Sequence, residues 1–88
     1  MRGPYRYDLS AASGPERGTA LDSGRGYGLL AEAERFAALR AYEWVGSEIA
    51  SEVEARIYDA RETLVRTRLV YTATKGPNRG RIVSERLS

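Results

Sequence analysis

LLAEAERFAALRAYEWVG, residues 29–46, is followed by SEIASEVEARIY, residues 47–58, and the spacing of the apolar residues changes between the two. The first stretch is rich in strong helix formers, and its apolar residues recur at intervals of three and four. From Val53 onwards apolar and polar residues alternate, which is typical of a strand with one buried face. Gly46 is a natural residue to end a helix. We therefore predict a helix over residues 29–45 and an extended chain after it.

The predicted helix has one broad apolar face and a polar face opposite it. Glu34 and Arg40 lie at the margins of the apolar face, and Tyr42 lies on the polar side. We expect Tyr42 to be exposed and available as an interface contact. The residues predicted to face the core are Leu29, Leu30, Ala33, Phe36, Ala37, Ala41 and Trp44.

Period-two patterns predict four strands around this helix. Tyr5–Leu9 is an aromatic-rich strand with Tyr5, Tyr7 and Leu9 facing inward. Val53–Tyr58 is joined by a short polar turn to the strand Val65–Tyr71. The turn residues Lys75–Gly80 then lead to a last strand over Arg81–Leu87. The predicted order is strand, helix, strand, strand, strand. This is a single α+β domain, with one amphipathic helix packed on a small antiparallel sheet.

Two parts of the chain allow a second interpretation. Val45, Ile49 and Val53 also fit helical spacing, so the helix could continue to Tyr58 and give a mostly helical protein. The β-branched and aromatic residues that follow, and the cost of a glycine within a helix, favour the α+β prediction. Residues 10–28 hold five glycines and one proline, so we expect a glycine-rich loop there, either functional or simply flexible, in which residues 19–21 could form a brief strand.

The composition excludes several kinds of chemistry. The 88 residues contain no Cys and no His, so the usual neutral-pH base, the strongest nucleophile and the common zinc ligands are missing. The glycines of SGRGYG, residues 23–28, lack the spacing of a nucleotide loop. We expect no catalysis, no cofactor and no metal.

The localisation is predicted from the absence of sorting signals. The start, MRGPYRYDLS, has no apolar signal region, and no apolar run approaches the length of a membrane span. A cytoplasmic protein without a membrane partner is the simplest expectation.

The C-terminal third of the chain is basic. From Arg61 to Ser88 seven basic residues stand against two acidic ones, a net of +5, in a chain whose total is +2. With Val65, Thr67, Leu69 and Tyr71 facing the core, the wet face of the sheet would be basic and aromatic. Such a face could serve as a binding platform. The simpler interpretation of the same pattern is an ordinary solvated face of an antiparallel sheet. The predicted contact residues are Arg56, Tyr58, Arg66 and Arg68 on this face, extended by Lys75, Arg79 and Arg81 of the following turn.

The architecture resembles a known group of proteins. A short aromatic strand (YRYDL), one Ala/Glu/Arg helix (AEAERFAALRAYEW) and a hairpin (VEARIYDARETLVRTRLVY) resemble the small βαββ proteins of phages, which include several anti-CRISPR inhibitors. The resemblance implies a stoichiometric inhibitor that blocks a large nucleoprotein complex. The basic C-terminal part differs from the acidic inhibitors that mimic DNA.

Three functions follow as hypotheses. The first is a non-catalytic binding module that contacts a protein partner, as an inhibitor or regulator encoded by a phage or mobile element. The alternative is direct binding of nucleic acid through the same basic surface. The third is self-assembly, in which an exposed edge strand pairs two copies, so that the protein is a monomer or a homodimer.

Overall fold

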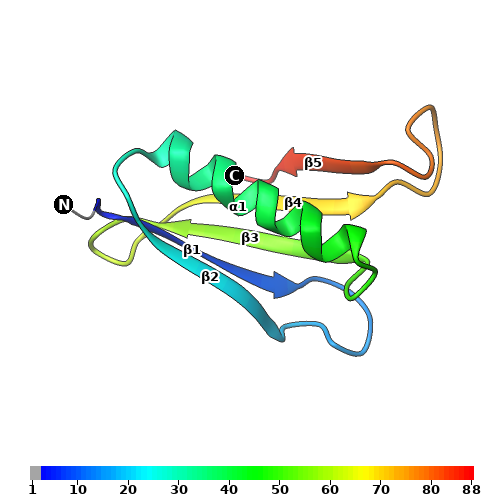
Figure 1. The fold of residues 1–88 in the computed structure, drawn as a ribbon, viewed down its shortest axis with the longest axis horizontal. Helices are drawn as coiled ribbons and strands as arrows, with labels where there is room; N and C mark the ends of the chain where they lie inside the picture. The colour runs from blue at the N-terminus through cyan, green and yellow to red at the C-terminus, as the bar shows by residue number, and fades with distance from the viewer. Residues whose placement is uncertain (1–2) are drawn as a thin grey trace.

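The computed structural model describes residues 3–88, and this part of the chain forms one helix and five strands (Figure 1). The predicted α+β fold is confirmed, and the alternative of a helix that continues to Tyr58 is wrong, because a strand begins at Glu52. The elements are β1 (Tyr5–Ala11), β2 (Ala20–Tyr27), α1 (Leu30–Gly46), β3 (Glu52–Tyr58), β4 (Leu64–Thr72) and β5 (Ile82–Arg86).

The five strands form one antiparallel sheet in the order β2-β1-β3-β4-β5. The helix crosses one face of this sheet and contacts all five strands (Figure 1). The other face carries no second layer in the part of the chain that the structure describes. We call these the covered face and the open face. Within residues 3–88 no helix is long and apolar enough to span a bilayer.

Of the edge strand β2 only a brief strand at its start, over residues 19–21, was predicted, because the sequence of β2, ALDSGRGY, is poor in strand-forming residues. It lies within the predicted loop of residues 10–28 and pairs with β1 along its length. Gly24 stands opposite Tyr7, and a Cβ atom at position 24 would lie 2.5 Å from the Tyr7 ring. The glycine that weakens the local strand signal is therefore what lets the buried tyrosine lie across its neighbour.

The helix approaches the sheet closely through small side chains. Ala33, Ala37 and Ala41 recur every four residues and are fully buried, with Val45 continuing the row. Below them Leu9, Val53, Ile57 and Val70 form the centre of the core, each fully buried. Tyr7 and Leu9 point inward, as predicted.

Two residues predicted to lie in the core are exposed instead. Leu29 precedes the helix and is 67% exposed, and Phe36 is 43% exposed. Phe36 lies at the β2 side of the helix, where its ring stacks on Tyr27 at 5.3 Å, and Tyr27 stacks on Tyr7 at 5.8 Å. Trp44 is partly buried against the core. The apolar face of α1 is thus narrower than the wheel predicted, because alanines rather than large residues occupy its middle.

The alternation of β4 was predicted in the wrong phase. Val70 is fully buried opposite Val53, whereas Leu69 and Tyr71 lie on the open face. A bulge shifts the β3–β4 register between Ile57 and Tyr58, because Ile57 pairs with Arg66 and Tyr58 with Leu64, which leaves Val65 of β4 as one extra residue. A shift of one residue turns every side chain of a strand to the opposite face.

Candidate interaction surfaces

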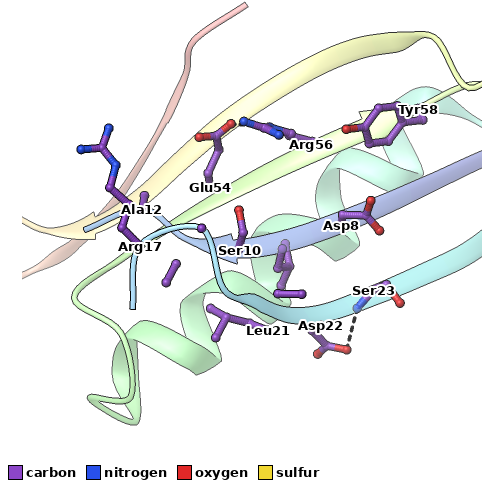
Figure 2. Close-up of a pocket in the computed structure, with 14 residues that line it drawn as sticks. Asp8, Ser10, Ala12, Arg17, Leu21, Asp22, Ser23, Glu54, Arg56 and Tyr58 are labelled. Atoms are coloured by element: carbon purple, nitrogen blue, oxygen red, sulfur yellow. Dashed lines mark hydrogen bonds and ion pairs between the residues drawn. The ribbon is translucent and has the colours of Figure 1, made fainter. Parts of the chain in front are cut away.

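The predicted contact face is divided between the two sides of the sheet. Arg56 and Tyr58 lie on the open face of β3 (Figure 2). Arg66 and Arg68 lie on the covered face of β4, because the residues opposite them on β3 are buried core residues. The prediction that these four side chains share one surface is therefore wrong.

Arg66 and Arg68 belong to an ion cluster around Glu34 of α1. The Glu34 carboxylate accepts hydrogen bonds from Arg68 Nη1 at 2.7 Å and Arg86 Nη2 at 3.1 Å, and Arg66 Nε lies 3.8 Å from it. Burial favours a raised pKa for Glu34, but the hydrogen bond from Arg68 and the charges of Arg86 and Arg68 outweigh it and hold the pKa below its usual value. These arginines fasten the helix to β4 and β5.

A second cluster fastens the other side of the helix to β2. Asp22 accepts hydrogen bonds from Arg40 Nη2 at 2.7 Å and from Trp44 Nε1 at 3.2 Å, and the backbone N–H of Ser23 donates to it at 2.9 Å. Burial favours a raised pKa for Asp22, and the three donors outweigh it, so the pKa lies below its usual value. Asp22 explains how a strand of weak local propensity is held at the edge.

Charged side chains on the open face are largely paired with one another. Arg6 donates to Asp8 at 2.8 Å and to Glu62 at 2.7 Å, and its guanidinium lies 4.2 Å from the centre of the Tyr58 ring. Arg56 forms an ion pair with Glu54 two residues away. These contacts satisfy Arg6 and Arg56 within the protein, so among the strand arginines of this face Arg25 is left without an ion pair to a described residue.

The strand residues of the open face carry a slightly acidic balance of charge, and Arg17 of the β1–β2 loop adds one cation at the edge of this face. The strand registers place three arginines and four carboxylates there: Arg6, Arg25 and Arg56, with Asp8, Glu52, Glu54 and Glu85. A basic platform of the kind that binds single-stranded nucleic acid is therefore not formed on this face.

A polar depression of about 690 Å³ lies where β1, β2 and β3 meet on the open face (Figure 2). Asp8, Ser10 and Glu54 point into it, but both carboxylates are paired with arginines. Neither is therefore placed as a free general base. No group of three or more potential metal ligands occurs among residues 3–88.

An apolar strip lies beside this depression, toward β5. Tyr71 stands directly opposite Val83, and Leu69 lies on the same face two residues before Tyr71. All three side chains are half-buried within the sheet. Carboxylates surround the strip, because Glu52 pairs with Tyr71, and Glu54 and Glu85 pair with Leu69 from its two sides. An apolar centre with a charged rim is the usual composition of a protein interface.

The remaining predicted contact residues lie away from the sheet faces. Lys75, Arg79 and Arg81 are exposed on the β4–β5 loop, as their turn sequence predicted. Tyr42 is 37% exposed on α1, as expected, but it faces the opposite side of the molecule from Arg56 and Tyr58.

Several important residues were missed in the sequence. The role of Glu34 could have been predicted from the sequence, because a carboxylate at the margin of an apolar helix face requires a partner, and the strand arginines could supply it. The sequence gives no sign of the apolar strip of Leu69, Tyr71 and Val83, since their exposure depends on which side chains of β4 face the helix. No protein-family model, no curated protein and no solved structure matches this chain. The proposals below therefore depend on the surfaces of this molecule alone.

Proposed function

We propose that this protein is a small, non-catalytic binding module that contacts a protein partner through the open face of its sheet. The observation that supports this function best is the strip of Leu69, Tyr71 and Val83, which α1 leaves uncovered. The strip offers apolar contact area, and its glutamate rim supplies specificity through charge.

The chemistry of the rim indicates what kind of partner fits. Glu52 and Glu85 form no ion pair within the described chain, and Glu54 has only Arg56 as its partner. A protein surface with apolar side chains surrounded by Lys or Arg would complement this arrangement. Tyr71 is the expected anchor, because a tyrosine supplies large contact area with few rotatable bonds.

The biological role that we attach to this contact is inhibition or regulation. The resemblance to phage-encoded βαββ inhibitors of the anti-CRISPR type implies stoichiometric binding to a large nucleoprotein complex. Such a role needs a surface and no catalytic group. The rival hypothesis of nucleic-acid binding through the sheet face has less support, because Arg6 and Arg56 of that face are paired with carboxylates and the strand carboxylates there outnumber the strand arginines.

The test is a tagged pull-down from the native host after nuclease treatment, with two matched variants. Tyr71→Arg removes the anchor and sets a cation against the basic partner surface. Leu39→Arg introduces the same charge on the outer side of α1, where Leu39 is 49% exposed. We expect wild type and Leu39→Arg to recover the same protein, and Tyr71→Arg to weaken its Kd about 30-fold or more, the size of a hot-spot loss.

The contrary results are equally clear. Equal recovery by the two variants would move the contact away from the strip. Recovery of no protein by wild type would remove the function itself. Light scattering at two concentrations identifies self-assembly, since a homodimer through this face would dissociate in Tyr71→Arg and persist in Leu39→Arg.

A further inference from the structure

Two hairpin loops of this protein share one sequence motif and one conformation. GPERG, residues 14–18, joins β1 to β2, and GPNRG, residues 76–80, joins β4 to β5. In both, the arginine N–H donates to the carbonyl of the first glycine at 3.2 Å, and the N–H of the last glycine donates to an alanine carbonyl at 2.8 Å. The pairs are Arg17 to Gly14, Gly18 to Ala11, Arg79 to Gly76 and Gly80 to Ala73. We call them the GPxRG loops.

The shared conformation follows from the glycines and the proline. The first and last glycines have φ values of +74° and +89° in one loop and +81° and +85° in the other. This left-handed region favours glycine. Proline suits the second position of the turn that the arginine closes. Both loops thus hold their arginine on the same type of turn.

The fold brings the two GPxRG loops to one end of the sheet. β1 and β4 are both antiparallel to β3, so they run in the same direction, and the loops that follow them project from the same end (Figure 1). The hairpins turn outward toward opposite edges of the sheet.

Equal hairpins that turn toward opposite edges are related by an approximate two-fold rotation about the direction of β3. The side chains confirm this relation. Leu9 faces α1, whereas Tyr71, which occupies the equivalent position before the second loop, lies on the open face. The two loop arginines are therefore a pair of equivalent donors around an axis that points out of the end of the sheet.

The cations at this end are free of ion pairs. Six other arginines each lie within 4.0 Å of a carboxylate: Arg6, Arg40, Arg56, Arg66, Arg68 and Arg86. Arg17, Lys75, Arg79 and Arg81 are exposed and form no ion pair with any described residue. The three loops at this end contain two carboxylates, Glu16 and Glu48, which leaves an excess of two positive charges.

We propose that the GPxRG loops form a two-pronged site for the phosphate backbone of duplex nucleic acid, with Arg17 and Arg79 on phosphates of opposite strands. The two strands of a duplex are themselves related by two-fold axes perpendicular to the helix, so equivalent donors meet equivalent acceptors. Arginine side chains and backbone N–H groups are the usual phosphate ligands.

The experiment measures fluorescence anisotropy of a 20-base-pair DNA duplex of mixed sequence at 50 and 200 mM salt. Arg17→Ala and Arg79→Ala are tested singly and together, with a matched control, Arg35→Ala/Arg61→Ala. Arg35 and Arg61 are exposed, form no ion pair in the described chain and lie on the helix and at the other end of the sheet. Thermal unfolding followed by circular dichroism verifies that each variant is folded.

We expect the salt increase to weaken duplex binding by the loop double variant about tenfold less than binding by wild type or the control. The salt increase should weaken duplex binding by each single variant about threefold less than binding by wild type, since each phosphate contact contributes about −0.9 to the salt slope. A double variant that behaves like the control would overturn the site. So would an effect confined to one arginine, or equal affinity for single-stranded DNA of the same length.

Two further binding measurements compare the phosphate backbones of DNA and RNA with each other and with a polyanion that has no phosphate. An RNA duplex of the same length shows whether the backbone of DNA or RNA is preferred, and either preference supports the site. Polyglutamate that binds as tightly as a duplex would overturn it. The site is independent of the strip on the open face, because Tyr71→Arg should leave duplex binding by the loops in place.

Discussion

The two faces of the sheet use arginine in opposite ways. On the covered face, Arg66, Arg68 and Arg86 surround Glu34, whose side chain is only 11% exposed. On the open face, Arg56 pairs with Glu54, and the Arg56 side chain is 49% exposed. The first arrangement joins three elements of the fold in a partly dry environment. The second joins neighbours along one strand in water, where solvent screens the attraction.

An arginine in an alternating pattern therefore has no fixed role. Arg56 and Arg68 occupy polar positions of neighbouring strands, and both resemble surface residues in the sequence. The position of a carboxylate on α1 makes one of them structural. Three of the seven basic residues of the C-terminal third therefore surround Glu34 inside the fold, and the other four, Arg61, Lys75, Arg79 and Arg81, lie in loops.

The largest loss of stability should come from shortening an apolar side chain on the covered face. Ile57→Ala removes a fully buried side chain beneath α1, so we expect a loss of about 3 kcal/mol in the free energy of unfolding. Leu69→Ala, its counterpart on the open face, should cost about 1 kcal/mol or less. Urea unfolding measures both. Equal losses would mean that the open face is also buried in solution, as in a stable assembly.

The next effect concerns the buried carboxylate. Glu34→Gln leaves three arginines without their counter-charge and should cost about 2 kcal/mol at pH 7. Because the pKa of Glu34 is lowered in the folded state, the carboxylate contributes its stability above its unfolded pKa of about 4.3 and loses it as the pH falls through the folded value.

Urea unfolding between pH 7 and pH 2 tests this direction of the pH dependence of stability. The stability difference between wild type and Glu34→Gln should shrink on acidification below about pH 4.3. Glu85→Gln on the open face is the control and should change stability little at any pH. A constant difference between wild type and Glu34→Gln across this range would contradict the role given to its charge.

The smallest effect should come from the exposed pair. Arg56→Ala should change the free energy of unfolding by about 0.5 kcal/mol or less, because both partners are solvated. The melting temperature should then move by about 4 °C at most. Arg68→Ala, which removes a donor to Glu34, should lower it further. If the two variants melted together, the distinction between the faces would fail.

Much of the fold could be predicted because its signals are local. The helical spacing before Gly46 and the alternation after Val53 each depend on neighbours in the chain, and both α1 and β3 were found within one or two residues of their ends. The exposure of Tyr42 was also readable from the helix alone. The candidate site was less accessible, because its composition depends on which face of β4 is covered.

Periodicity, glycine and proline act over a few residues, and these local signals are enough for the order of the helix and four strands, the inward positions of β1 and β3, and the turns of the GPxRG loops. The other features come from contacts between distant segments. Gly24 lies under the Tyr7 ring and lets residues 20–27 form a strand, and one extra residue within β4, Val65, reverses the faces of that strand. The tertiary structure also brings the two GPxRG loops to one end. These outcomes depend on residues that are distant in the sequence, so the spacing of neighbouring residues cannot predict them.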